Sequence, residues 1–116
     1  MIRINHVNLP VPPGRSEEVA GFYIDLLGLA VADRWDSGRA GAWLDLGDGA
    51  QVHLSERDVP SSPDYHVAFV VDDFEGVRDR AANTGIPWID RGAGRAFLHD
   101  PAGNLIELFA PEAAPG

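Results

Sequence analysis

The chain has 116 residues, 45% of them hydrophobic and 23% charged, which suits one globular domain and leaves too little chain for two independent cores. No apolar run approaches the roughly 20 residues of a membrane helix, and a net charge of −9 disfavours binding to nucleic acid or anionic lipid. The absence of cysteine excludes disulfides, thiolate nucleophiles and cysteine-bound zinc, so any metal must be held by His, Asp or Glu.

The first half of the chain predicts a strand, a helix and three further strands. The first strand covers residues 2–11, IRINHVNLPV. The helix begins with Ser16 as its N-cap and ends at Gly28. Its predicted buried stripe consists of Val19, Phe22, Tyr23, Leu26 and Leu27. The three short strands are AVADRWD (30–36), AGAWLDL (40–46) and QVHLSE (51–56), with a GDG turn at 47–49.

The second half repeats this order after a linker at residues 57–63. A strand is expected over DYHVAFVVD (64–72), and the helix opens where Asp72 and Glu75 have the spacing of a capping box. Gly85 ends this helix, whose apolar face contains Phe74, Val77 and Ala81. The last strands are PWIDR (87–91), RAFLH (95–99) and LIELFA (105–110), with a turn at DPAGN (100–104) and a frayed tail at 111–116.

Two internal alignments show that the chain contains two copies of one module. AWLDLGDGAQVHL (42–54) aligns without a gap with AFLHDPAGNLIEL (96–108), at an offset of 54 residues. INHVNLPV (4–11) matches DYHVAFVV (64–71) at an offset of 60. The sequence therefore predicts an α+β fold of two tandem βαβββ modules, at about 2–56 and 64–110, in a single domain at 1–110.

Four polar side chains occupy matched positions in the two modules. His6 aligns with His66, and His53 aligns with Glu107. If the modules pack around a pseudo-two-fold axis, these donors converge from four strands. Three neutral imidazoles and one carboxylate suit a borderline divalent cation, namely Zn, Ni, Co, Mn or Fe(II). An octahedral ion would keep two positions for water or a chelating substrate.

Each of these side chains also has a purely structural interpretation. A histidine in a strand is commonly a hydrogen-bonded structural residue, and Glu107 could lie on an exposed edge. His53 could lie near the ion and donate a hydrogen bond instead of binding it. An unpaired carboxylate between Ile106 and Leu108 is costly to bury, which favours a bound partner for Glu107. The matched positions of the four side chains in the two modules also favour metal binding.

Several quoted stretches resemble a known superfamily. HVNLPV…FYIDLLGL, HVAFVVDD and DPAGNLIEL together resemble the vicinal oxygen chelate proteins over residues 2–110. This superfamily includes glyoxalase I, fosfomycin-resistance proteins, extradiol dioxygenases and bleomycin-resistance proteins. The resemblance implies a glyoxalase-like fold with half-open curved sheets around a metal, completed in a homodimer. It also implies that His6, His66 and Glu107 are metal ligands.

The sequence departs from individual members of the superfamily at informative positions. His53 stands where glyoxalase I has a glutamate ligand, so a base supplied by that glutamate would have to come from elsewhere. Residues 33–56 also resemble the fosfomycin thiol transferases, but Phe97 and Arg95 replace the tyrosine and serine that this resemblance implies. Bleomycin-resistance proteins generally lack the metal ligands that are present in this sequence.

Aromatic and polar residues on the predicted strands are candidates for a substrate pocket. The predicted substrate-binding residues are Trp43, Gln51, Arg95, Phe97 and His99. The other tryptophans, Trp35 and Trp88, could line the pocket or pack in the core or at a dimer interface. Arginines that could hold a carboxylate or phosphate are Arg39, Arg91 and Arg95, although solvation at the surface is the commoner fate of such residues.

Two classes of function follow from these observations. The first is a metal-dependent lyase or isomerase of the glyoxalase type, in which a divalent cation acts as a Lewis acid on a small substrate with vicinal oxygens. An Fe(II) dioxygenase and a fosfomycin-type thiol transferase are further variants of this class. The second is a non-catalytic protein that binds a small molecule or antibiotic. We expect a cytoplasmic homodimer in either case, with no nucleic-acid or membrane partner.

Overall fold

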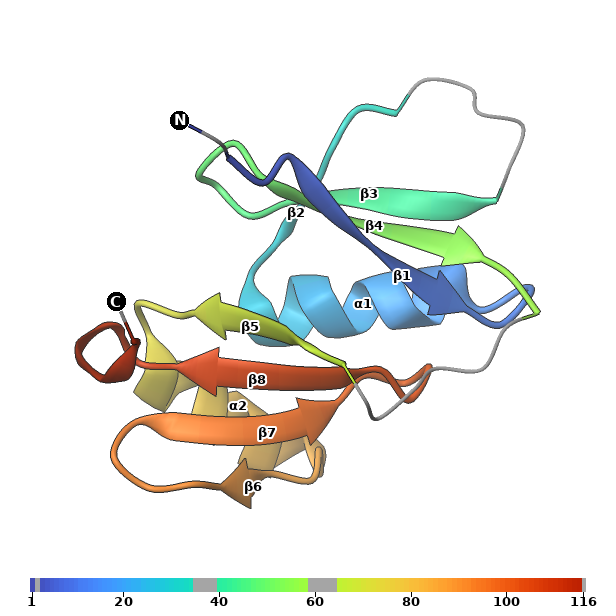
Figure 1. Ribbon diagram of the computed structural model, residues 1–116. Coiled ribbons are helices and arrows are strands. Elements are labelled where there is room, and N and C mark those ends of the chain that lie inside the picture. Colours follow the sequence, from blue (N-terminus) through green and yellow to red (C-terminus); the bar gives the residue numbers. More distant parts are fainter. Residues whose placement is uncertain (2, 35–39, 59–64, 116) are drawn as a thin grey trace. The chain divides into compact units, whose positions relative to one another are not determined.

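The structure is a computed structural model that describes residues 1, 3–34, 40–58 and 65–115. The chain divides into two compact units, Met1–Ser61 and Ser62–Gly116. Within the described ranges, each unit contains one α-helix and one four-stranded mixed sheet (Figure 1). The predicted α+β class and the tandem βαβββ modules are confirmed. Trp35 and Arg39 lie outside the described residues, as does the end of the strand expected at 30–36.

The sheet of unit 1 has the strand order β1-β4-β3-β2. Strand β1 runs parallel to β4, whereas β3 pairs antiparallel with both β4 and β2. Because β1 and β4 are parallel, the chain must cross over between them, and α1 is part of this connection. The elements are β1 (His6–Val11), α1 (Ser16–Leu27), β2 (Ala30–Val31), β3 (Gly41–Asp45) and β4 (Gln51–Glu56).

Unit 2 repeats this topology with the strand order β5-β8-β7-β6. Strand β5 is parallel to β8, and β7 is antiparallel to β8 and β6. The elements are β5 (Val67–Val70), α2 (Phe74–Thr84), β6 (Ile89–Asp90), β7 (Arg95–His99) and β8 (Leu105–Phe109), followed by a 3-10 helix at Pro111–Ala113. Strands β1 and β5 begin later than expected, so His66 directly precedes its strand.

The pairing registers agree with both sequence alignments. Trp43 is opposite His53 in unit 1, and Phe97 is opposite Glu107 in unit 2, which reproduces the offset of 54. On the parallel side, Asn8 is opposite His53 and Ala68 is opposite Glu107, which reproduces the offset of 60. The internal repeat therefore describes the backbone as well as the sequence.

Both helices end at a glycine as predicted, but the residues that cap their amino ends differ from the prediction. Gly28 and Gly85 end the helices as predicted, with left-handed φ values of 77° and 72°. The prediction that Ser16 caps α1 is wrong, because its hydroxyl donates to the Glu56 carboxylate at 2.5 Å and Arg15 holds the cap position. Helix α2 is capped by Asp73, which accepts from the Gly76 N–H at 3.1 Å, one residue after the predicted Asp72.

Alternation along the central strands separates a core face from a polar face. Val52 and Leu54 in β4, and Ile106 and Leu108 in β8, are fully buried or nearly so. Helix α1 packs on β3 and β4. The buried helix residues are Val19, Ala20, Phe22, Tyr23 and Leu26 in α1, and Phe74, Val77 and Ala81 in α2. The residues between the buried aliphatic ones, His53 and Glu107, therefore project from the opposite face.

The segment after β8 is tied to the turn before β7. Residues 111–113, expected to be frayed, form the 3-10 helix, and the Ala110 N–H donates to the Gly94 carbonyl at 2.8 Å. A Cβ atom at Gly94 would lie 2.9 Å from Cβ of Ala110, so only glycine fits this close approach. In the described part of the chain, no helix has the length and apolar character needed to cross a membrane.

We predict that Asp100→Ala destabilises the fold by about 2–3 kcal/mol, because the buried Asp100 carboxylate accepts from the backbone N–H groups of Ala102 and Asn104 and from the Asn104 amide. Urea denaturation measures this change. Asp48→Ala in the corresponding turn of unit 1 is the control, because exposed Asp48 accepts a single bond from the Ala50 N–H. Equal losses in the two variants would contradict the prediction.

Candidate functional site

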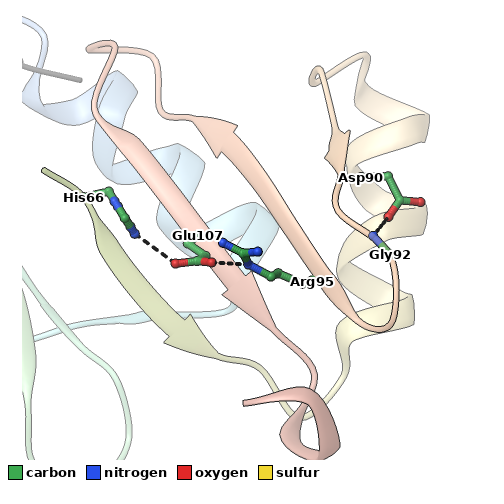
Figure 2. Close-up of polar contacts among 5 residues, drawn as sticks. All are labelled: His66, Asp90, Gly92, Arg95 and Glu107. Carbon is green, nitrogen blue, oxygen red and sulfur yellow. Dashed lines mark hydrogen bonds and ion pairs between the residues drawn. The ribbon is translucent and has the colours of Figure 1, made fainter. Parts of the chain in front are cut away.

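Glu107 is the polar centre of the unit 2 sheet. Its side chain is buried, with 5% of the residue exposed, and both of its carboxylate oxygens are hydrogen-bonded. Oε1 lies 2.9 Å from Nε2 of His66, and Oε2 accepts from Nε of Arg95 at 2.5 Å (Figure 2). The parallel pairing of β5 with β8 brings His66 beside Glu107, although the two are 41 residues apart.

The surroundings of Glu107 keep its carboxylate ionised. Burial alone raises the pKa of this carboxyl, but the hydrogen bonds and charges of Arg95 and His66 outweigh that effect, so the pKa lies below its ordinary value. The carboxylate is therefore ionised at neutral pH, which is the form that a cation binds.

Unit 1 carries a stack of three rings on its polar face. The imidazole of His53 lies between Trp43 and His6, with ring centroids 4.4 Å and 3.9 Å away and interplanar angles of 6° and 14°. Since both neighbours are parallel to His53, they cover its two opposite faces. Arg34 extends the stack, with its Cζ 5.8 Å from the Trp43 ring centroid. Only the edge of the His53 ring is open.

A chain of hydrogen bonds sets the tautomer of His53. Asp45 accepts from the Gln51 amide nitrogen at 3.0 Å, which turns the Gln51 carbonyl oxygen toward His53. That oxygen lies 2.8 Å from Nε2 of His53, so Nε2 carries the proton and Nδ1 is the lone-pair nitrogen. Sequence reasoning missed Asp45 in this role, although its alternation with Trp43 on β3 places both on one face.

His53 remains neutral to lower pH than an ordinary histidine. Burial lowers its pKa, and its electrostatic interactions with His6 and Arg34 lower it further. A neutral imidazole is the form that binds metals or accepts a proton.

The stacked arrangement separates the roles of His6 and His53. An ion lies close to the plane of each imidazole that binds it, so two nearly parallel rings 3.9 Å apart cannot both bind one ion as they stand. His6 is exposed and its Nδ1 bonds only to the neighbouring Asn5 side chain at 2.8 Å, so it can turn more easily. His53 is held on both faces and at Nε2.

The predicted substrate residues divide between the two units. Trp43 and Gln51 contact His53 in unit 1. In unit 2, Phe97 meets His66 edge-to-face at a centroid distance of 5.4 Å, and Arg95 pairs with Glu107. His99 is exposed at the end of β7.

Trp88 differs from the prediction, because it precedes β6 and does not lie on a strand. It packs edge-to-face on Phe74 of α2 at a centroid distance of 5.5 Å. Trp88 therefore contributes to packing against the helix.

The four predicted metal ligands form two pairs, one in each unit. His6 and His53 belong to unit 1, and His66 and Glu107 belong to unit 2. Among the residues that the structure describes, no group of three or more His, Cys, Asp and Glu side chains is placed to hold a metal ion. The convergence of all four donors on one ion stays a prediction.

Comparison with known proteins identifies the family. The Glyoxalase/Bleomycin resistance protein/Dioxygenase superfamily matches residues 3–108, which is nearly the whole chain. The chain belongs to this superfamily. This confirms the resemblance to the vicinal oxygen chelate proteins. No curated protein sequence matches the chain.

Solved structures share the glyoxalase-like fold over almost their whole length. A protein from Bacillus anthracis described as a member of the glyoxalase family is 26% identical, with a TM-score of 0.84 and 95% of each chain covered. The fosfomycin resistance protein FosX from Listeria monocytogenes, in complex with Mn(II) and a dihydroxypropylphosphonic acid, is 18% identical, with a TM-score of 0.75 and coverage of 95% and 93%. The antibiotic-binding protein TnmS3 from Streptomyces is 20% identical, with a TM-score of 0.74 and coverage of 96% and 97%.

The environment of His53 predicts a pH dependence of stability. The pKa of His53 is lower in the folded chain than in the unfolded chain, where it has the ordinary histidine value of about 6.5. Near this pH the unfolded state therefore binds more protons than the folded state. The free energy of unfolding should therefore fall as the pH decreases through this range. Thermal denaturation between pH 8 and 5.5 should show a shallower decline for His53→Phe than for the unmodified chain.

His99→Phe is the matched control, since His99 is exposed. It should retain the full decline. Identical profiles for His53→Phe and the unmodified chain would contradict this account of His53.

Proposed function

We propose that this protein is a metal-dependent enzyme of the glyoxalase type. It would use a divalent cation as a Lewis acid on a small substrate with vicinal oxygens, in lyase or isomerase chemistry. The proposal rests on superfamily membership and on the donor pair formed by His66 and Glu107.

The separation of this donor pair fits one divalent ion. Two ligands at right angles, each about 2.1 Å from an ion, are about 3 Å apart. Nε2 of His66 and Oε1 of Glu107 are 2.9 Å apart. The two side chains hold this spacing because Arg95 fixes the other carboxylate oxygen. This distance is also that of the hydrogen bond between the two side chains; the adjacency of an imidazole nitrogen and a carboxylate oxygen on one face is the observation on which the proposal chiefly depends.

The protonation states also fit a metal site. A metal needs ionised carboxylates, and the lowered pKa of Glu107 favours this form, while the lowered pKa of His53 keeps that imidazole neutral to lower pH than an ordinary histidine. We assign His6, His66 and Glu107 as the ligands. His53 acts either as a fourth ligand or as a neighbouring hydrogen-bonding group, and its closed stack favours the second role.

The chain's own residues would prepare the substrate for this chemistry. A bound divalent ion would supply Lewis acidity, which stabilises negative charge on a substrate oxygen. Arg95 keeps Glu107 oriented and ionised, which is the usual role of a partner behind a metal ligand. Trp43 and Phe97 provide aromatic surface on the same faces as His53 and Glu107.

A second candidate is a protein that binds a small molecule without catalysis. The likeness to the antibiotic-binding protein TnmS3 favours it, as does the aromatic stack on Trp43. Such binding would persist in the presence of a chelator, whereas the metal enzyme requires its ion.

We predict that the protein binds one or more of Zn²⁺, Ni²⁺, Co²⁺, Mn²⁺ and Fe²⁺, and that Glu107→Gln weakens this binding by more than about 100-fold. Residues that only hydrogen-bond to a metal ligand contribute about 10–100-fold to metal affinity. Loss of the charge of a ligand itself should therefore weaken metal binding by more than this. Isothermal titration calorimetry of chelator-treated protein measures the affinities. His66→Ala should weaken binding similarly.

Glu75→Gln and His99→Ala are the controls for these variants, because both side chains are exposed in unit 2. Both should bind metal as the unmodified chain does. A protein that binds none of the five ions, but is stabilised by a small ligand in the presence of EDTA, would exclude the enzyme and support the binding protein.

We also propose that two copies of the chain associate. Edge strands of both sheets carry exposed apolar side chains, namely Val31 on β2, Val70 on β5 and Ile89 on β6. A symmetric partner would cover such edges.

We predict that light scattering at micromolar concentration gives twice the mass of the chain, and that Val70→Lys shifts the mass toward a single chain because a buried unpaired charge disfavours association. Asp72→Lys just beyond the same strand serves as a control for the added charge. A single-chain mass for the unmodified protein would refute the dimer.

A further inference from the structure

Two arginine side chains lie on the same aromatic ring of unit 2. Cζ of Arg95 is 5.2 Å from the centroid of Phe97, and Cζ of Arg91 is 5.5 Å from it. Both distances are within the range of a cation–π interaction. Phe97 is also opposite Glu107 in the β7–β8 register, so the two guanidinium groups lie on the face that carries the donor pair.

The turn between β6 and β7 brings the two arginines together. Gly92, Ala93 and Gly94 all have left-handed φ values, between 52° and 78°. Arg91 donates its backbone N–H to the Arg95 carbonyl at 2.9 Å, and the Asp90 carboxylate accepts from the Gly92 N–H at 2.7 Å (Figure 2). The local backbone is therefore fixed, and the carboxylate nearest to Arg91 in the sequence is engaged by the turn.

Most donors of this arginine pair have no acceptor. Arg95 uses only Nε to reach Glu107, and its side chain is 44% exposed. Within the described ranges, neither Nη group of Arg95 nor the guanidinium of Arg91 has a hydrogen-bond or ion-pair partner. By contrast, Arg78, which lies 5.5 Å from the Phe74 ring centroid in a similar way, is paired with Glu75.

The charges on this face favour an anionic ligand. Arg91 and Arg95 place two positive charges beside one ring, and Glu107 compensates only one of them. A planar guanidinium group donates two parallel hydrogen bonds to two oxygens of a carboxylate or phosphate. The Nη groups of Arg95 and the guanidinium of Arg91 are suited to such binding.

We propose that Arg91 and Arg95 form a binding site for an oxyanion, a carboxylate or phosphate, carried by the substrate. The inference rests on the proposed function for its location, because it places the anion next to the carboxylate assigned to the metal. It narrows the substrate to a small organic anion, whose charged group contacts the arginine pair and whose neighbouring oxygens lie toward Glu107. A neutral substrate would leave the charge of Arg91 uncompensated, since Glu107 compensates that of Arg95.

Binding of simple anions to the metal-free protein tests this inference separately from metal binding. The full chain, labelled with ¹⁵N and freed of metal by a chelator, is titrated with acetate or inorganic phosphate at constant ionic strength, with chloride as the reference salt. The side-chain Nε–Hε signals of Arg91 and Arg95 should shift with saturation for at least one oxyanion. Saturation by acetate alone identifies a carboxylate site, and saturation by phosphate alone a phosphate site.

Arg91→Gln is the decisive variant, because Arg91 touches none of the proposed metal ligands. It should weaken oxyanion binding about tenfold, the effect of one charge-assisted hydrogen bond. Arg78→Gln, which removes the same charge from a paired arginine in the same unit, should leave the affinity unchanged. Linear shifts equal to those with chloride, or equal affinities for both variants, would overturn the inference.

The outcomes are independent of the test for metal binding. A protein that binds divalent ions but shows no saturable oxyanion binding retains the proposed function and loses this site. A protein that binds the oxyanion through Arg91 but no divalent ion retains the site and loses the metal-dependent reaction.

Discussion

A buried carboxylate must keep its hydrogen bonds, and this constraint organises the polar face of unit 2. Glu107 satisfies it with one partner from each neighbouring strand region, since His66 precedes β5 and Arg95 begins β7. Either partner alone would leave one carboxylate oxygen without a donor in a nearly closed environment. The parallel pairing of β5 with β8 and the antiparallel pairing of β7 with β8 therefore bring together the two partners that hold the pKa of Glu107 below its ordinary value.

The two units use the same sheet for different chemistry. In unit 1 the matched position holds His53, and its neighbours are rings that stack on it; in unit 2 it holds Glu107, and its neighbours are charged or polar groups that bind it. A neutral ring is stabilised by contact over its faces, whereas a carboxylate is stabilised at its two oxygen atoms. The two units thus share a common backbone, and differences in residue type at matched positions, His53 against Glu107 and Gly41 against Arg95, give different contacts.

Much of the fold could be predicted from the sequence, because hydrophobic alternation, helix-ending glycines and the repeat all act locally. The registers opposite His53 and Glu107 follow from the two alignments. The predicted cap of α1 was wrong because the Ser16 hydroxyl donates to Glu56, which is 40 residues away. Likewise, the tautomer of His53 depends on Asp45 and Gln51 from two strands, and the parallel rings of His6 and His53 depend on rotamers. Such side-chain geometry leaves no periodic signal in a single sequence.

The close contact of Gly94 with Ala110 connects the carboxyl-terminal segment to the arginine-bearing turn. Because the Ala110 N–H is bonded to the Gly94 carbonyl, tension applied after β8 is transmitted to this hairpin and is not absorbed by loose chain.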